Sequence, residues 1–544
     1  MNSTEFFIRR RITTTLLMTA VSIFGLLAYF GLPVSDRSRL GSYAVFALAM
    51  SVTTPVWPAD LQTDPVIEAL RPEAETYITA GMLKFDVPGL AIGIVVNDRL
   101  SYSKGFGVRR KSGLAVDPST VFQIGSATKS FLSATMALMV DRGKFRWDDR
   151  VLDLNEDFRL KDPWVTREFR VFDLLAQRSG LPPYVNDAFG LLGLNGTLLI
   201  QSLRYVEPVS SFRSAFAYTN VTHILAGRIV AKAAATQDWN QVLQRELLDP
   251  LGMRDTSYTA AAIEAAPNHA IGYRWTPNGT VEVSFTQIFP YDFDGAGDIN
   301  SNVEDASRWL RFQLGAGSFE GRRIVSSENI TVTHTPKVAI SDKASYAMGW
   351  VVQQTPNGTI IWHNGGTTSF GAYFGLLPDK NAGVVVLTNE VNVGLPDAIG
   401  RWVLDRILDN PKVDYVAEVY KAASASFEKA AKQFAPPASR EPSPPITPFA
   451  GRFKHPGIGE ATVSVDGNDL VMTLVASGAK LKLASWNGDV FTAQLMATDK
   501  FLAVAENLGP RPNAFVQFQM DADAKPNLLH LVFDDGQAYD FTRE

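Results

Sequence analysis

The sequence contains no cysteine, and this absence excludes several kinds of chemistry. A chain without cysteine has no disulfide bond, no thiolate zinc site and no cysteine nucleophile. Histidine is also scarce, because the six His residues are scattered and never form an H-E-x-x-H pair. That pair is the pattern that places two zinc ligands on one face of a helix in metalloproteases. We therefore expect neither a metal nor any other cofactor.

The chain also lacks a strong excess of charge of one sign. Its 51 Lys and Arg residues are nearly balanced by 56 Asp and Glu residues, which gives a formal net charge of −5. Proteins that bind nucleic acid usually carry a basic surface, so nucleic acid is not an expected partner. At 544 residues the chain is too long for one compact core, and two or three domains are expected.

The N-terminal region has a different composition from the rest. The three arginines of Arg9–Arg11 precede an uncharged run from Ile12 to Leu32, which is long enough to span a bilayer. A second apolar run, Leu40–Trp57, contains an Ala-Leu-Ala sequence of the kind found at signal-peptide cleavage sites. Residues 1–59 are therefore expected to form a membrane anchor or a signal region and to be the only contact with a membrane. The rest of the chain is expected in the periplasm, either free or anchored facing it.

The first motif with chemical meaning is Ser126-Ala-Thr-Lys129, where a short β-like run gives way to an amphipathic helix. A spacing of three residues puts Ser126 and Lys129 on the same face of that helix. Ser126 would lie near the first turn, where free backbone N–H groups favour a developing oxyanion. A lysine can accept the serine proton only if desolvation or nearby positive charge lowers its pKa.

Two further clusters follow the first one along the chain. Tyr218-Thr-Asn220 lies at a turn before an apolar, helix-like run, and His363-Asn-Gly365-Gly366 lies on a β-branched and aromatic stretch that indicates a strand. The order of the three clusters resembles that of the serine β-lactamase and penicillin-binding superfamily, whose motifs are S-x-x-K, S-D-N and K-T-G. The chain is most similar to the class C β-lactamase-related peptidases, which include D-aminopeptidases, D-Ala-D-Ala carboxypeptidases and esterases.

This resemblance implies a role for each residue of the three motifs. Ser126 would be the nucleophile, and Lys129 with Tyr218 would form a coupled proton relay in which Lys129 lowers the pKa of the phenol. Asn220 would orient a substrate amide. The third motif implies further roles. The Gly365-Gly366 pair would let the substrate approach closely, and the backbone N–H groups of Gly366 and Ser126 would form the oxyanion hole. His363 would assist the relay or bind a carboxylate when protonated.

The resemblance also implies a function. The chain is expected to be an exported serine hydrolase that cleaves amide bonds beside D-amino acids or in non-standard peptides, such as linearised microcystin at its D-Ala-Leu bond. His363 stands where class C β-lactamases have Lys, which favours peptide cleavage over β-lactam hydrolysis. No Gly-x-Ser-x-Gly surrounds Ser126, so an α/β-hydrolase is disfavoured.

Two alternatives remain open, namely a carboxylesterase of the same family and a penicillin-binding or scaffold protein with little turnover. The expected partner is a small peptide or amide, and the chain could form a homo-oligomer. Loops at residues 182–197 and 263–294 are expected to set specificity, because their Phe, Tyr and Leu content indicates an apolar wall.

The expected fold class is α+β, with a β-lactamase-like and mostly antiparallel sheet covered by helices, an all-helical subdomain and a C-terminal lipocalin-like β-barrel. Strands are expected at Gly89–Val96 and Leu100–Val108, joined by a turn at Asn97, and later at 347–354, 358–363, 369–377 and 383–388. The expected domains are 60–412 for the hydrolase, 413–447 for a helix and Pro-rich linker, and 448–544 for the β-domain with about eight strands.

Overall fold

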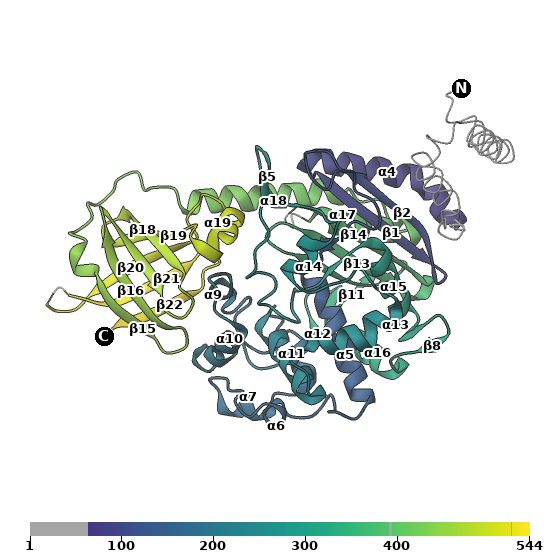
Figure 1. The fold of residues 1–544 in the computed structure, drawn as a ribbon, viewed down its shortest axis with the longest axis horizontal. Helices are drawn as coiled ribbons and strands as arrows, with labels where there is room; N and C mark the ends of the chain where they lie inside the picture. Colours follow the sequence, from purple (N-terminus) through teal and green to yellow (C-terminus); the bar gives the residue numbers. More distant parts are fainter. Residues whose placement is uncertain (1–63, 391–393, 524) are drawn as a thin grey trace, which may run out of the picture. The chain divides into compact units, whose positions relative to one another are not determined.

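An eight-stranded antiparallel sheet is the central feature of the computed structural model, which describes residues 64–390, 394–523 and 525–544 (Figure 1). In spatial order its strands are β2 (Arg99–Gly107), β1 (Gly89–Val96), β14 (Ala382–Thr388), β13 (Gly371–Leu377), β12 (Gly358–Gly366), β11 (Val351–Thr355), β10 (Ala344–Tyr346) and β9 (Val338–Ala339). The predicted antiparallel sheet is thereby confirmed.

The middle strands of this sheet are buried on both faces, which explains their nearly continuous apolar sequence. Along β14, Val384 and Val386 belong to one core cluster while Val385 and Leu387 belong to the other, as the two-residue period of a strand requires. One face is covered by α4 (Pro65–Phe85), α17 (Leu395–Ile407) and α18 (Tyr415–Gln433), and the other by α5 (Thr128–Asp141) and α15 (Val303–Leu314).

A run of short helices forms the predicted helical subdomain beside α5. Its members are α6 (Val151–Leu154), α7 (Pro163–Glu168), α8 (Val171–Leu175), α9 (Asp187–Leu191), α10 (Gly196–Ser202), α11 (Val221–Ala234), α12 (Trp239–Leu243), α13 (Asp249–Leu251) and α14 (Ala260–Ala265). Helix α11 packs against α5, α8 and α10, so the subdomain shares one hydrophobic cluster with the face of the sheet that α5 and α15 cover. Small ribbons complete this part of the chain, including β3 (Phe122–Gln123) paired with β6 (Asn300–Ser301), β4 (Gly272–Thr276) paired with β5 (Gly279–Val283), and β7 (Ser318–Phe319) paired with β8 (Arg322–Arg323), followed by α16 (Ser327–His334).

The predicted turns agree with the backbone, and one predicted strand begins later than expected. Asn97 and Asp98 both have positive φ, as a tight hairpin between β1 and β2 requires. The strand predicted to start at residue 347 starts instead at Val351. The reason is Gly349, which has φ of 75° and passes so close to α5 that a Cβ there would lie 2.5 Å from the Lys129 carbonyl oxygen.

The C-terminal part of the chain is a closed antiparallel barrel, as predicted. Its strands pair in chain order, namely β15 (Gly451–His455), β16 (Gly459–Asp466), β17 (Asp469–Leu474), β18 (Lys480–Asn487), β19 (Val490–Leu495), β20 (Ala514–Met520), β21 (Pro526–Phe533) and β22 (Ala538–Arg543). Pairing of Phe453 with Arg543 closes the barrel. A short helix, α19 (Leu502–Leu508), lies between β19 and β20. Along the barrel strands, inward apolar side chains alternate with outward ones, as in β19. Closure of the barrel leaves no exposed sheet edge among its strands.

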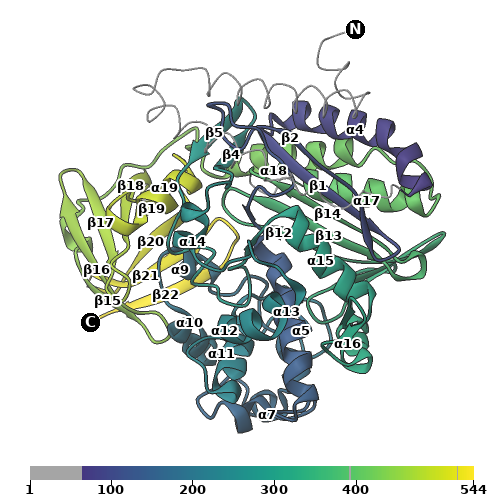
Figure 2. The ribbon, with the colours of Figure 1, turned by 45° about the vertical axis from the view of Figure 1, so that its right-hand side comes forward.

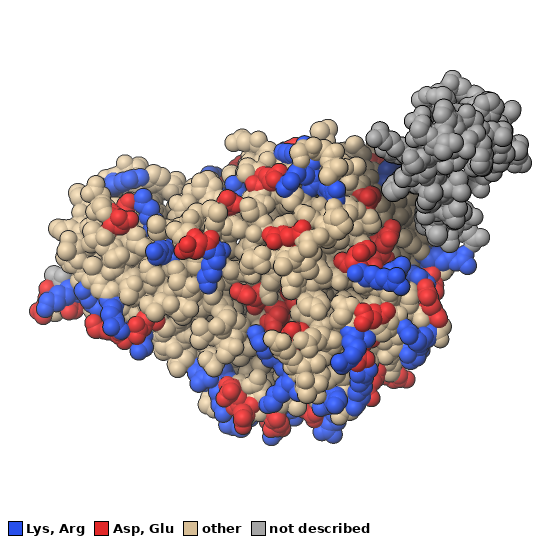
Figure 3. All heavy atoms as spheres, viewed as in Figure 1, with Lys and Arg blue, Asp and Glu red and all other residues tan. Residues whose placement is uncertain are grey.

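The expected membrane anchor at 1–59 lies outside the described residues. Within residues 64–390, 394–523 and 525–544, none of the helices is long and apolar enough to cross a membrane. On the face drawn in Figure 3, Lys and Arg side chains of the described residues are interspersed with Asp and Glu.

Candidate functional site

The turn before α5 brings Ser126 and Lys129 together. Ser126 lies in the 3-10 turn η1 (Gly125–Ala127), one turn before Lys129 in the first turn of α5. Gly125 has φ of 50°, and a Cβ there would lie 2.7 Å from the Gly366 backbone nitrogen at the end of β12. Glycine therefore lets the first and third motifs meet backbone to backbone.

Lys129 is fully buried beneath Ser126 and has three hydrogen-bond acceptors. Its Nζ donates to Ser126 Oγ at 3.1 Å, to Asn220 Oδ1 at 2.7 Å and to the Ala296 carbonyl oxygen at 2.8 Å. A neutral amine has only two N–H groups, so in that form the bonds to Asn220 and Ala296 use both and the lone pair faces the Ser126 hydroxyl. The amine is thus aimed at the hydroxyl that it would have to deprotonate.

Burial lowers the pKa of Lys129 to about 7, while the charges of Asp187 and Asp298 act in the opposite direction. Desolvation disfavours the charged form, so a large part of the lysine is the neutral amine near neutral pH. This is the direction that a proton-accepting lysine requires.

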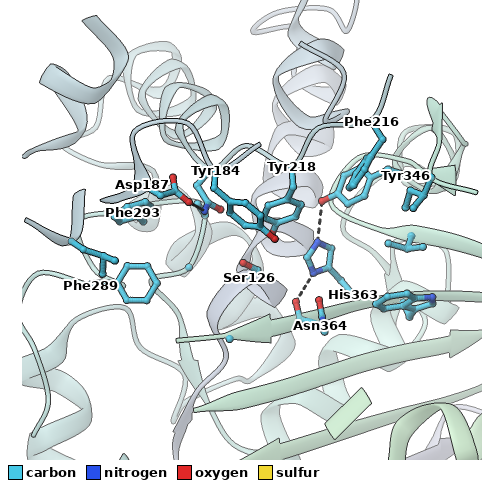
Figure 4. Close-up of a pocket in the computed structure, with 18 residues that line it drawn as sticks. Ser126, Tyr184, Asp187, Phe216, Tyr218, Phe289, Phe293, Tyr346, His363 and Asn364 are labelled. Carbon is cyan, nitrogen blue, oxygen red and sulfur yellow. Dashed lines mark hydrogen bonds between the residues drawn. The ribbon is translucent and has the colours of Figure 1, made fainter. Parts of the chain in front are cut away.

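Tyr218 lies over the same amine, with its ring centroid 4.8 Å from Lys129 Nζ. Figure 4 shows Tyr218 beside Ser126. Burial raises the pKa of Tyr218 well above its usual value, and a hydrogen bond with Ser126 lowers it by less. The prediction that the pKa of this phenol is lowered is therefore wrong, because desolvation of the phenolate is the largest influence on it. Tyr218 is a protonated hydroxyl that can donate a proton.

Asn220 connects the relay to the loop before α9. It accepts from Lys129 through Oδ1 and donates from Nδ2 to Asp187 Oδ2 at 2.6 Å. Asp187 is partly buried on the cavity wall, and desolvation raises the pKa of its carboxyl to about 7 against the opposing effects of Asn220 and Lys129. The two bonds fix which end of the Asn220 amide faces the lysine.

His363 is positioned differently from the sequence-based expectation. Its Nδ1 donates to the Asn364 carbonyl oxygen at 2.5 Å, and its Nε2 accepts from the Tyr346 hydroxyl at 2.9 Å. Burial lowers the pKa of His363 to about 3, and the Lys129 charge lowers it further. The expected protonated His363 that binds a carboxylate is wrong for this structure, because both ring nitrogens have protein partners and the ring is neutral.

The two glycines of the third motif differ in what they touch. Gly366 lines the cavity. Gly365 is not among the lining residues, and a Cβ there would lie 1.8 Å from the Ile124 carbonyl oxygen. Glycine is required at position 365 because β12 passes close to the chain before Ser126. The prediction had attributed this glycine to a close approach of the substrate.

Ser126 opens into a cavity of about 490 Å³ whose walls are mainly aromatic and aliphatic. Among the described residues that line it, Asp187 is the one carboxylate, and none is Lys or Arg. Both predicted specificity loops contribute to it. The apolar lining residues are Tyr184 and Leu191 from the first loop, Phe289 and Phe293 from the second, and Phe216, Ile340, Tyr346, Val351 and Trp362.

Sequence reasoning missed two polar residues of the site, Asp187 and Tyr346. Asp187 lies inside the loop at 182–197, where an acid among apolar residues was a usable signal. Tyr346 in β10 reaches His363 in β12 because both strands pair with β11, which lies between them, and no local pattern marks Tyr346.

Comparison with known proteins follows the two parts of the fold. A family model described as Beta-lactamase matches residues 74–407, and a domain of unknown function, DUF3471, matches residues 435–543. An unguisins hydrolase of Aspergillus campestris is 27% identical over 416 residues, which is 70% of this chain and 76% of the relative. Protein flp of Staphylococcus aureus strain MW2 is 25% identical over 358 residues, 65% of this chain and 70% of the relative.

Two solved structures share the fold at 22% sequence identity. The octameric penicillin-binding protein homologue from Pyrococcus abyssi matches with a TM-score of 0.58 over 87% of this chain and 100% of that chain. A class C beta lactamase from Rhodobacter sphaeroides matches with a TM-score of 0.52 over 61% of this chain and 98% of that chain.

Proposed function

The chain belongs to the beta-lactamase family and is a serine hydrolase of the β-lactamase-related type, and from this premise we propose that it cleaves amide bonds through an acyl-enzyme on Ser126. The observation that carries the proposal is the Lys129 amine, which is fully buried, lies 3.1 Å from Ser126 Oγ and has a pKa lowered to about 7.

Acylation uses the neutral amine and the Tyr218 hydroxyl in turn. Ser126 Oγ attacks the substrate carbonyl carbon while its proton passes to Lys129 Nζ, which leaves a tetrahedral oxyanion. The backbone N–H groups of Ser126 and Gly366 donate to that oxyanion. Tyr218 then protonates the leaving nitrogen as the C–N bond breaks, and Lys129 returns its proton to the phenolate. The first product leaves as an amine, and the acyl group stays on Ser126 as an ester.

Deacylation reverses the order of proton transfers with water as the nucleophile. Water attacks the ester carbonyl and gives its proton to the Lys129–Tyr218 pair, which returns a proton to Ser126 Oγ as the ester bond breaks. The second product leaves as a carboxylic acid. Each residue thus ends the cycle in its starting protonation state.

We propose a peptide with uncharged, apolar groups around a D-residue as the substrate, with linearised microcystin at D-Ala-Leu as one example. The supporting observation is the cavity wall, which among the described residues has aromatic side chains, one acid and no Lys or Arg. Such a wall offers no cation for a substrate carboxylate beside the scissile bond. The unguisins hydrolases among the relatives also support hydrolytic turnover.

Export is also proposed, with residues 1–59 as anchor or signal region and the hydrolase in the periplasm. The basic residues before the apolar run Ile12–Leu32 support this orientation. Protease treatment of spheroplasts from cells that express the full chain tests this proposal. A hydrolase domain that the protease digests only after the spheroplasts are lysed would lie in the cytoplasm and would contradict it.

Product analysis by mass spectrometry tests the proposed reaction. The full chain is incubated with a D-Ala-Leu peptide, its L-Ala counterpart, a p-nitrophenyl ester and a penicillin, each beside the Ser126→Ala variant. Cleavage after D-Ala that disappears in the variant supports the proposal. Turnover of the ester alone would indicate a carboxylesterase, and a stable penicillin adduct without turnover would indicate a penicillin-binding protein.

A further inference from the structure

The loop that carries Asp187 has an unfavourable backbone. Tyr184 and Asn186 have φ of 56° and 63°, in the left-handed region that residues with a Cβ rarely adopt. Asn tolerates this region, but Tyr184 costs about 1 kcal/mol or more there unless neighbouring groups hold it. Tyr184 and Asp187 line the cavity, so whatever holds this loop also shapes the cavity.

The groups that hold the loop come from the C-terminal barrel. Gln537, in the turn between β21 and β22, donates from Nε2 to the carbonyl oxygens of Pro183 at 3.1 Å and Tyr184 at 3.0 Å. The Tyr539 hydroxyl in β22 donates to Asn186 Oδ1 at 3.0 Å. Both left-handed residues therefore have a barrel side chain as a partner.

Apolar contacts support the same junction. Phe189 in α9 is fully buried and packs edge-on against Phe533 and Tyr539, with ring centroids 5.3 Å and 4.6 Å away. Figure 2 shows the end of β21 and β22 beside α9. Asn186 and Tyr539 are themselves almost completely buried, so solvent does not compete for their hydrogen bond.

The loop in turn contacts the reactive centre at two points. The backbone N–H of Tyr184 donates to the Tyr218 carbonyl oxygen at 2.6 Å. Asp187 accepts from Asn220, which accepts from Lys129. A continuous set of hydrogen bonds thus runs from the barrel through the loop to the residues around Ser126.

We infer that Gln537 and Tyr539 are positioning residues for the substrate cavity, and that the barrel holds the loop Pro183–Asp187 in its substrate-binding conformation. The inference rests on the proposed function, because it assigns the loop to that cavity. Loss of either side chain would let the loop relax from its left-handed conformation and withdraw Tyr184 and Asp187 from the wall. Ser126 lies in η1 and Lys129 in the first turn of α5, so both would keep their geometry.

Steady-state kinetics of the full chain with the p-nitrophenyl ester of N-acetyl-D-alanine test this inference. The variants are Gln537→Ala and Tyr539→Phe, and the matched control is Gln517→Ala. The control glutamine also lies in the barrel, but its side chain bonds to Asp489 within the barrel. Labelling of Ser126 by a small fluorophosphonate is measured in parallel, because this reagent reports the nucleophile and makes little contact with the cavity wall.

We expect KM to rise about tenfold in both test variants, as the loss of hydrogen bonds of this kind implies, with kcat changed by less than about threefold. The rate of Ser126 labelling in both test variants should equal that of the wild type. The control Gln517→Ala should equal the wild type in KM, kcat and labelling. Equal KM values in all four proteins would overturn the inference alone. A wild-type protein that is neither labelled nor active would overturn the proposed function and, with it, this inference. Should Gln537→Ala fail to fold, Tyr539→Phe decides, because it removes one oxygen atom.

Discussion

Asn220 donates a 2.6 Å hydrogen bond from Nδ2 to Oδ2 of Asp187. Because an amide has distinct ends, this bond turns the carbonyl end of Asn220 toward Lys129, where it accepts at 2.7 Å. The second motif of the sequence is thereby fixed between a partly buried acid, Asp187, and a fully buried base, Lys129. Several measurable consequences follow for the base, the acid and their surroundings.

Replacement of the base should abolish turnover. We expect Lys129→Met to lower kcat/KM for an activated ester by about a thousandfold, the range expected when a general base is removed. Lys129→Arg should not restore activity, because a guanidinium does not lose its proton near neutral pH. Thermal unfolding checks that both variants fold. Activity of Lys129→Met within tenfold of the wild type would mean that another group accepts the proton.

The pH profile should report the neutral amine. Burial lowers the pKa of Lys129 to about 7, and the unprotonated form is the active one. The ratio kcat/KM should therefore rise with pH through about 7 and level off above it. Tyr218, whose pKa is raised well above its usual value, should add no limb at neutral pH. A profile that falls through pH 7 would contradict a neutral lysine base.

The pH at which kcat/KM rises, expected near 7, should change when a nearby negative charge is removed. The charge of Asp187 raises the pKa of Lys129, as does that of Asp298. Asp187→Asn keeps an oxygen that accepts from Asn220 but removes the charge, so the limb should shift to lower pH by about one unit. A shift to higher pH would show that Asp187 does not act on Lys129 through its charge.

Tyr346 should matter for stability more than for catalysis. Tyr346→Phe leaves the buried Nε2 of His363 without its donor at 2.9 Å, which should lower the free energy of unfolding by about 1–3 kcal/mol. Activity should fall by less than about fivefold. Tyr373→Phe is the matched control, because its buried hydroxyl has no partner within the described structure and its removal should be neutral. A loss of activity as large as that of Lys129→Met would place His363 in the proton relay.

Gly365 should tolerate no side chain. A Cβ at this position would lie 1.8 Å from the Ile124 carbonyl oxygen, so Gly365→Ala must displace the chain before Ser126. We expect a loss of about 3 kcal/mol or more in the free energy of unfolding, together with loss of activity. Gly467→Ala, at a barrel turn where a Cβ meets nothing within 4 Å, should cost about 1 kcal/mol. Denaturant unfolding of both variants measures the difference.

Local patterns predicted most of the fold and the reactive residues. Three predicted features depend only on neighbours in sequence, and the structure contains all three. They are the spacing of Ser126 and Lys129, the turn at Asn97 and the alternating strands of the barrel.

The protonation states could not be predicted in the same way. Tyr218 and His363 depart from expectation because both are buried, and burial is a property of the assembled core. The partnership of Tyr346 with His363 and that of Tyr539 with Asn186 depend on chain segments brought together by the fold. Neither contact leaves a periodic signal in the sequence.

Intact-mass measurement of the acyl-enzyme shows whether Ser126 is the nucleophile. The full chain is quenched in acid within seconds of mixing with the p-nitrophenyl ester of N-acetyl-D-alanine and then digested for peptide mapping. We expect a mass increase of one acyl group, located on Ser126 and absent from Ser126→Ala. An acyl group on another residue, or hydrolysis that persists in Ser126→Ala, would contradict it.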